Sequence, residues 1–239
     1  MTLNDSIVSF KDVGKVYRIG EISVNALRNV SLKINTGEFV VILGPSGSGK
    51  TTMLNLIGGI DSATSGEIIV ADNRVDRLNE KELTAYRRRN IGFIFQFFNL
   101  IPTLTAAENV DLALELSDER KSTTSLDILE QVGRKERADH FPNQLSGGEQ
   151  QRVAIARALA KHAPVMLCDE PTGELDFETG IKILTLLKQL NRTKKQTFIL
   201  VTHNAVIGNI ADRVIKLRSG QIIEDNLNNS IIEPEKLKW

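Results

Sequence analysis

A glycine-rich stretch, GPSGSGKT at residues 44–51, has the residue types and spacing that most clearly predict chemistry in this sequence. It fits the pattern G-x-x-x-x-G-K-[ST] without a mismatch, and it lies between an apolar run and a helical pattern. In such a loop, backbone N–H groups surround phosphate oxygens, Lys50 places positive charge beside the β and γ phosphates, and the Thr51 hydroxyl can bind magnesium. We therefore predict a phosphate-binding loop rather than an ordinary glycine turn.

Two adjacent carboxylates form a second candidate site. Asp169 follows four apolar residues, so we expect it to end a buried strand and to reach a magnesium ion. Glu170 comes next, and a carboxylate there could orient and partly deprotonate a water that attacks the γ-phosphate. An isolated Asp-Glu pair is equally well explained as a helix N-cap, but the phosphate loop in the same chain favours the metal-and-base interpretation.

Gln96 and His203 each follow a further apolar run, IGFIF and FILVT. Taken alone, each is explained as a polar strand terminus, and a histidine ring there can hydrogen-bond to local backbone. Ligands of parallel sheets bind at the carboxyl ends of the strands, where Gly44, Asp169 and Glu170 are also expected. The sequence therefore predicts that these five residues meet at one edge of a sheet.

A second candidate anion site lies in LSGGEQQRVAIARAL, residues 145–159. Ser146 and Glu149 have the S-x-x-E spacing of a capping box, and Gly147 and Gly148 lie between them. The pattern predicts a helix N-terminus that can hold an anion, about a hundred residues after the first loop.

The elements that must position these residues follow from the hydrophobic pattern. We expect strands at residues 6–10, 31–35, 39–43, 65–72, 91–96, 164–170 and 196–203. We expect helices at residues 52–60, 79–89, 106–116, 124–132 and 178–190. Apolar strands that alternate with helices predict an α/β fold whose parallel sheet is covered on both faces. No strand is expected between Thr105 and Ala163, so that stretch is predicted to be an inserted helical subdomain.

Composition limits the choice of partners and compartment. The 30 basic and 30 acidic residues cancel, so no overall field draws the chain to nucleic acid or to an anionic membrane surface. The run Arg87 to Arg89 is expected to be a solvated helix face. The single cysteine, Cys168, predicts core packing in a reducing compartment, and no signal peptide or spanning segment is expected, which favours the cytosol.

Five motifs in this order resemble those of the ATP-binding cassette (ABC) ATPases, over nearly the whole chain. GPSGSGKT, Gln96, LSGGE, VMLCDEP and His203 are similar to Walker A, the Q-loop, the signature sequence, Walker B and the switch histidine. YRRRNIGFIFQFFNLIPTLTAAENV and DEPTGELD most resemble the lipoprotein-release and macrolide-exporter branch. The resemblance implies a P-loop NTPase parallel-sheet core with an N-terminal antiparallel β subdomain and an inserted α-helical subdomain. Residues 1–239 would be one nucleotide-binding domain, with the core at 1–96 and 163–239 and the helical subdomain at about 97–162.

The resemblance also implies ATP and Mg²⁺ as cofactors. Residues expected to contact ATP are Tyr17, stacked on adenine, with Gly44, Pro45, Ser46, Gly47, Ser48, Gly49, Lys50, Thr51, Thr52 and Gln96. Those expected at the metal are Thr51, Gln96 and Asp169, and those expected in catalysis are Glu170 and His203.

In that family two subunits pack head to tail, which explains the second anion site. Ser146, Gly147, Gly148 and Glu149 would cap the γ-phosphate held by the partner's Walker A loop, so two ATP molecules would join a homodimer. Asp176 is expected to couple the two sites. Hydrolysis would remove the link, so ATP would close and open the dimer.

The resemblance implies a separate membrane permease as partner, with the cassette on the cytoplasmic face of the membrane and without nucleic acid. QFFNLIPTL, residues 96–104, is either a docking surface for a cytoplasmic helix of that partner or part of the subdomain's own core. The alternatives are a soluble cassette ATPase acting on DNA or ribosomes, and a regulatory module without hydrolysis. Glu170 argues against the last, since a sensor needs no base there.

Two departures from the branch are visible. Glu174 stands in the loop before Asp176 where a small or amide residue is expected, and it adds negative charge near the predicted dimer contact. The segment between Leu116 and Arg137 is shorter than expected, which predicts an altered surface on the helical subdomain.

Overall fold

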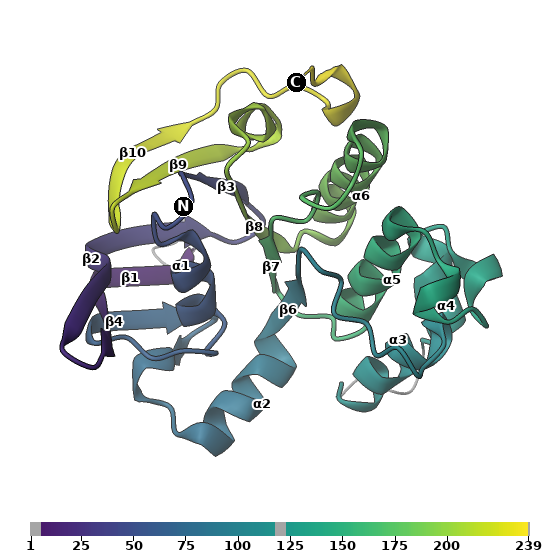
Figure 1. Cartoon of the computed structure of the whole chain (residues 1–239), viewed down its shortest axis with the longest axis horizontal. Helices are drawn as coiled ribbons and strands as arrows, with labels where there is room; N and C mark the ends of the chain where they lie inside the picture. Colours follow the sequence, from purple (N-terminus) through teal and green to yellow (C-terminus); the bar gives the residue numbers. More distant parts are fainter. Residues whose placement is uncertain (1–5, 118–122, 239) are drawn as a thin grey trace.

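The structure is a computed structural model that describes residues 6–117 and 123–238. Its central element is a six-stranded sheet in the order β10-β9-β3-β8-β7-β6 (Figure 1). These strands are β3 (Phe39–Leu43), β6 (Ile91–Ile94), β7 (Val165–Asp169), β8 (Thr197–Thr202), β9 (Arg213–Arg218) and β10 (Gln221–Leu227). All neighbouring pairs are parallel except β9 with β10. The predicted α/β class with a parallel core is confirmed.

The central strands are buried on both faces, which explains their continuous apolar runs. In β3, Phe39 and Val41 belong to the core shared with helices α5 (Gly147–Leu159) and α6 (Phe177–Lys194). Val40 and Ile42 alternate with them and belong to the core beneath α1 (Lys50–Ile57). Two hydrophobic cores therefore hold the sheet between layers, and the loops at its carboxyl edge are fixed by rigid strands.

An antiparallel sheet in the order β2-β1-β4-β5 covers α1 on its other side (Figure 1). Its strands are β1 (Ser6–Ile19), β2 (Ile22–Asn35), β4 (Ser65–Val70) and β5 (Asn73–Arg74). The predicted strands at 6–10 and 31–35 cover only the beginning of β1 and the end of β2. The register of this pair shifts between Phe10 and Val13 and again near Lys15, so the alternation that marks a strand is interrupted there.

The helices lie in two groups. Helix α2 (Glu80–Asn90) precedes β6, with Asn79 as N-cap, while α3 (Ala106–Glu115), α4 (Ser125–Gln131) and α5 form a separate lobe (Figure 1). No strand occurs in the described residues of that lobe, as predicted. Residues 118–122, in the segment predicted to be short, lie outside the described residues. Short 3₁₀ helices span Val75–Arg77, Lys135–Arg137, Pro142–Gln144, Ala205–Ile210 and Pro234–Lys236.

Burial and contacts bear on three further predictions, which concern the cysteine, the arginine run and membrane-spanning helices. Cys168 is fully buried, as predicted, and burial raises the pKa of its thiol. Arg87 and Arg88 donate hydrogen bonds to the backbone carbonyls of Gly59 and Leu116, so they link elements as well as facing solvent. Within the described residues, no helix combines the length and the apolar character that crossing a bilayer requires.

Candidate functional site

A cavity of about 870 Å³ opens at the carboxyl edge of the parallel sheet. The predicted residues on its wall are Tyr17, residues 45–47 and 49–52, Gln96, Asp169, Glu170 and His203. Gly44 and Ser48 belong to the same loop but do not line the wall. The structure therefore brings together the candidates from four strand ends, as the parallel-sheet argument predicted.

The local geometry between β3 and α1 supports the predicted phosphate-binding loop. Gly49 has φ +106°, and a Cβ there would lie 2.5 Å from the carbonyl oxygen of Ala26, so only glycine fits. Lys50 is 8% exposed, and its Nζ donates to the carbonyls of Gly44 at 2.7 Å and Pro45 at 3.1 Å. The ammonium is thus held over its own loop, where backbone N–H groups and the N-terminus of α1 favour an anion.

Thr51 and Asp169 form a pair of oxygen donors beside the loop. The Thr51 hydroxyl donates to Asp169 Oδ1 at 3.3 Å, and burial, with the nearby Glu170 charge, raises the pKa of Asp169. Hydroxyl and carboxylate oxygens suit Mg²⁺, which binds through few protein ligands and completes its shell with phosphates and waters. No group of three or more His, Cys, Asp or Glu side chains in the described chain could hold a metal alone. These residues fit a metal that arrives with a phosphate ligand.

Glu170 is held in an uncommon conformation next to this pair. Its φ is +46°, and its backbone N–H donates to the carbonyl of Val201 at 3.0 Å. Its Oε1 accepts from the backbone N–H and from Nδ1 of His203, both at 3.0 Å. A carboxylate only accepts, so Nδ1 carries the proton in this contact. Strained backbone of this kind clusters at functional sites, because the surroundings must hold the side chain in place.

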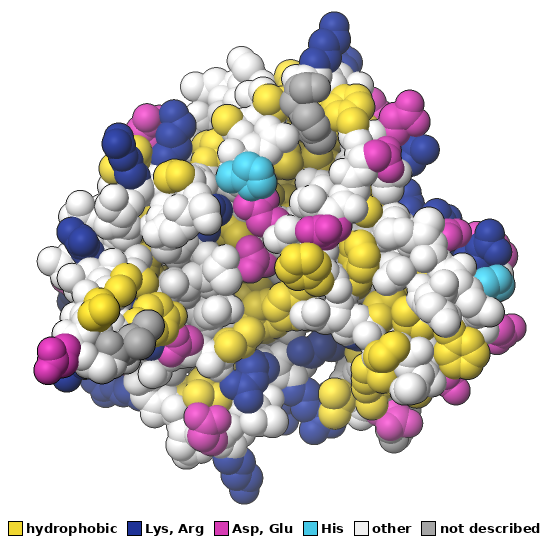
Figure 2. Space-filling model, in the orientation of Figure 1, with side chains coloured by type: hydrophobic (Ala, Val, Ile, Leu, Met, Phe, Trp, Pro, Cys, Tyr) yellow, Lys and Arg dark blue, Asp and Glu magenta, His cyan; other side chains and the backbone are white. Residues whose placement is uncertain are grey.

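The two partners differ in access to solvent. The His203 side chain is 71% exposed, whereas that of Glu170 is 16% exposed. On the face drawn in Figure 2, acidic side chains gather beside a histidine near the centre. The Glu170 carboxylate therefore lies below an open rim formed by His203.

Tyr17 lies at the other end of the cavity, where the antiparallel sheet forms the wall. Its hydroxyl donates to Asp61 Oδ2 at 2.7 Å, and Lys15 Nζ donates to Asp61 Oδ1 at 2.5 Å. Lys15 Nζ also lies 4.7 Å from the centre of the Tyr17 ring. Burial, and then the bond to Asp61, raises the pKa of Tyr17. The ring is therefore fixed from two sides, as a stacking platform requires.

The stacking on adenine that the family resemblance implies for Tyr17 gives a first prediction. Tyr17→Ala should weaken ATP binding about 5- to 150-fold, because stacking of a base on an aromatic ring contributes about 1–3 kcal/mol. Tyr17→Phe, which keeps the ring and loses only the bond to Asp61, should weaken it much less. Titration of both variants with ATP by calorimetry measures the difference, and equal affinity of Tyr17→Ala and the parent would exclude the stacking role.

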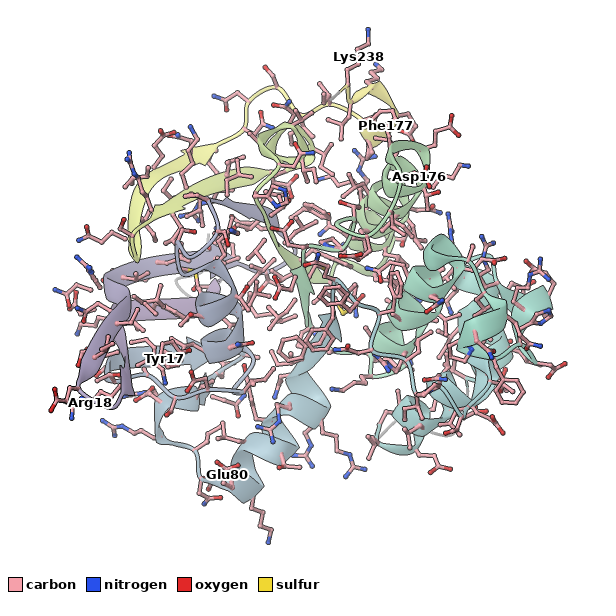
Figure 3. All side chains as sticks on the ribbon, viewed as in Figure 1. Tyr17, Arg18, Glu80, Asp176, Phe177 and Lys238 are labelled. Carbon is pink, nitrogen blue, oxygen red and sulfur yellow. The ribbon has the colours of Figure 1, made fainter. Side chains whose placement is uncertain are left out.

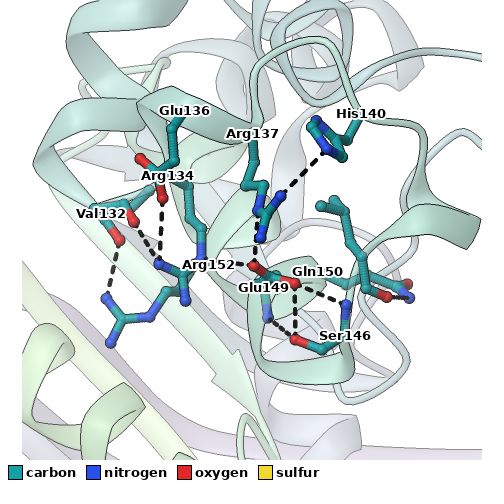
Figure 4. Close-up of polar contacts among 11 residues, drawn as sticks. Val132, Arg134, Glu136, Arg137, His140, Ser146, Glu149, Gln150 and Arg152 are labelled. Atoms are coloured by element: carbon teal, nitrogen blue, oxygen red, sulfur yellow. Dashed lines mark hydrogen bonds and ion pairs between the residues drawn. The ribbon is translucent and has the colours of Figure 1, made fainter.

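The predicted capping box is present at the N-terminus of α5, where the second anion site is expected. Ser146 Oγ accepts from the Glu149 N–H at 3.4 Å, and Glu149 Oε2 accepts from the Ser146 N–H at 3.0 Å (Figure 4). The Ser146 N–H lowers the pKa of Glu149, and Arg137, whose Nε donates to Oε1 at 3.2 Å, acts in the same direction. A Cβ on Gly148 would lie 2.3 Å from Thr179 Cγ2, so the helix end packs too closely on α6 for a larger residue.

This helix end does not reach the cavity of its own chain. None of the residues 146–149 lines the cavity, and neither does Asp176, which caps α6 by accepting from the Thr179 N–H at 3.0 Å. Figure 3 shows Asp176 and Phe177 at the start of α6, well away from Tyr17. Within one protomer, the two predicted anion sites therefore lie apart.

Sequence reasoning missed part of the wall. Val24, Asn25 and Ala26 of β2 line the cavity near Tyr17, yet they belong to no motif. Pairing with β1, which sets Val24 opposite Tyr17, and the close approach of Ala26 to Gly49 place them there, and both depend on tertiary structure.

A family profile described as "ABC transporter" matches residues 27–173, more than half of the chain. The chain belongs to the ABC transporter family. This cassette is 49% identical to the ABC transporter ATP-binding protein MJ0796 of Methanocaldococcus jannaschii, over 90% of this chain and 95% of that protein. It also superposes on the dimeric structure of MJ0796 in a post-hydrolysis state bound to ADP and Pi. That match has a TM-score of 0.85 and 46% identity and covers 93% and 99% of the two chains.

The resemblance to the macrolide-exporter branch is confirmed as well. The cassette is 45% identical to the macrolide export ATP-binding/permease protein MacB of Rhodopirellula baltica, over 88% of this chain. It spans only 32% of that protein's length. As a member of the family, the cassette is an ATPase.

Proposed function

We propose that this cassette is the ATP-hydrolysing subunit of an ABC transporter of the exporter, lipoprotein-release or mechanotransmission type, acting on the cytoplasmic face of a membrane. It would bind two ATP-Mg in a head-to-tail homodimer and drive a separate membrane-spanning partner. The observation that carries the proposal is the separation of the two anion sites: the cavity holds the loop, the metal pair and Glu170, while Ser146 lies outside it.

In this proposal, the phosphate loop and Tyr17 bind ATP. Tyr17 stacks on adenine, the backbone N–H groups of residues 46–52 and Lys50 hold the phosphates, and Mg²⁺, when bound, neutralises phosphate charge. Thr51, Asp169 and Gln96 would hold that ion. A bound Mg²⁺ would also offset the cost of burying the Asp169 charge. Without the ion, burial raises the pKa of this carboxyl group.

Hydrolysis would depend on Glu170 and His203. Oε1 of Glu170 is engaged by two N–H groups of His203, which orients the carboxylate. Its other oxygen, Oε2, makes no hydrogen bond with the described residues and would accept a proton from the attacking water. His203 would hold the base in place and close the exposed rim.

A second copy would complete each cavity. The N-terminus of α5, with Ser146, Gly147, Gly148 and Glu149, would face the γ-phosphate in the partner's loop. A C2 pair would give two equivalent composite sites, and Asp176 would lie close to the dimer axis and couple them. MJ0796 supports this proposal because its solved cassette is dimeric with ADP and Pi.

The membrane partner is proposed to dock in an apolar groove of about 240 Å³ between β6 and helices α3 and α5. Phe93, Phe95, Leu112 and Leu116 line it, and the Phe93 and Phe95 rings stack with centroids 5.2 Å apart. A cytoplasmic helix of a permease is the proposed occupant, because the MacB relative carries ATP-binding and permease parts in one chain. The groove lies beside the predicted stretch at 96–104. Of that stretch, Phe97 is 68% exposed, whereas Leu100 packs on the core.

Leu112→Asp tests the docking and the proposed function together. Placed in the groove, the charge should abolish co-purification of a membrane protein with the tagged cassette from solubilised membranes of the native cell, while ATP-dependent dimerisation is retained. Leu126→Asp on α4 is the matched control, because Leu126 is 43% exposed and Leu112 is 40% exposed. A membrane protein recovered equally with both variants would place its docking elsewhere. Recovery of only ribosomes or nucleic acid with the parent would favour the soluble alternative instead.

A further inference from the structure

The contact between Gln96 and Glu174 joins two loops that no motif links. Gln96 Nε2 donates to Glu174 Oε1 at 2.8 Å. We propose that Glu174 is a positioning residue that holds the Gln96 amide with its oxygen available to the Mg²⁺ of bound ATP. This inference rests on the proposed function, because it assigns a role to Gln96 within the proposed ATP-Mg site.

The chemistry of the two groups decides which end of the amide faces Glu174. An ionised carboxylate accepts hydrogen bonds and donates none, so the NH₂ end of Gln96 must face it. The terminal torsion of glutamine is broad, and without such a partner the amide can present either end to the cavity. The NH₂ end cannot bind a cation, whereas the oxygen can. A carboxylate at this position therefore selects the orientation that is useful to a metal.

Packing restricts the same side chain. Gln96 lines the cavity, and a Cβ on Gly173 would lie only 3.1 to 3.3 Å from Gln96 Nε2, Cδ and Cγ. The segment beneath it is a tight turn, since the Gly173 N–H donates to the Glu170 carbonyl at 3.0 Å. Residues 173 and 174, three and four positions after the proposed base, thus fix Gln96 by contact and by hydrogen bond.

The same turn touches the helical lobe. Leu175 Cδ2 lies 3.4 Å from the position of a Cβ on Gly147, at the N-terminus of α5. Gln96 itself follows β6, where the chain leaves the core for that lobe. The Glu174 contact therefore links the metal side of the cavity, the turn after Glu170 and the start of α5 within one protomer.

Metal dependence separates this role from a merely structural one. In a Glu170→Gln background that retains ATP, Glu174→Ala should raise the Mg²⁺ concentration for half-maximal ATP retention about three- to tenfold. ATP affinity in EDTA should not change, because Glu174 would not touch the nucleotide. Glu178→Ala, which removes the same charge from an exposed position in the first turn of α6, is the control and should leave the Mg²⁺ requirement unchanged.

A double variant makes the test specific to Gln96. In a Gln96→Ala background, Glu174→Ala should have no further effect on the Mg²⁺ requirement. An unchanged requirement in Glu174→Ala alone, or an equal increase with and without Gln96, would overturn the inference and leave the proposed function standing. Failure of the Glu170→Gln parent to retain ATP at any Mg²⁺ concentration would count against the proposed function itself.

Discussion

Glu170→Gln is expected to reduce ATP turnover at least about a hundredfold while ATP binding survives, and to accumulate a dimer with ATP. The amide has the shape of the carboxylate, so the contact with His203 and the cavity wall can persist. It cannot accept the proton of the attacking water, and general-base catalysis contributes about 10²- to 10⁴-fold. The chain would then bind ATP but hydrolyse it only slowly, so the ATP-bound dimer would accumulate.

Steady-state phosphate release measures the turnover, and light scattering during gel filtration measures how much dimer accumulates with ATP. Glu178→Gln, the same chemical change in the first turn of α6, should behave like the parent in both. Turnover close to that of the parent in Glu170→Gln would remove Glu170 from the role of base.

Lys50→Ala should act at an earlier step and weaken ATP binding about ten- to a hundredfold. Its ammonium lies over the loop and would form charge-assisted hydrogen bonds with phosphate oxygens, which contribute about 1.5–3 kcal/mol each. The residue is also 8% exposed and binds two loop carbonyls, so alanine removes packing as well as charge.

Lys50→Met separates these two causes, because it keeps the aliphatic length without the charge. Calorimetric titration with ATP should give nearly the same loss for both variants, with thermal unfolding followed as a control for folding. If Lys50→Met bound ATP as tightly as the parent, the assignment of the loop lysine to the phosphates would be wrong.

The parallel core could be predicted because its strands are buried on both faces. Residues 39–43, 164–170 and 196–203 contain apolar runs, the first followed by the glycine loop and the others ending on polar residues, and they form β3, β7 and β8. The strands of the second sheet were harder to delimit, since their pattern is interrupted by register shifts in β1. The hairpin of β9 and β10 was missed because most of β10 is exposed and polar.

The candidate site, too, could be predicted only in part. Lys50, Thr51, Asp169 and Glu170 could be predicted because each lies in a local motif at the end of a strand. The support of Tyr17 by Asp61 could not be, because 44 residues separate them and only the fold brings them together. Glu174 was visible as a departure from the family pattern, but its partner Gln96 lies 78 residues away.

The central claim is that each ATP site is built from two chains, and complementation between two defective variants tests it most directly. In the Glu170→Gln background, Lys50→Ala removes the loop lysine and Ser146→Arg blocks the N-terminus of α5. Neither variant alone should retain labelled ATP through rapid gel filtration. In a mixed dimer, the intact loop of one chain meets the intact α5 of the other, so a 1:1 mixture should retain ATP. Retention by Ser146→Arg alone at the level of the parent would mean that one chain completes the site, which contradicts the account.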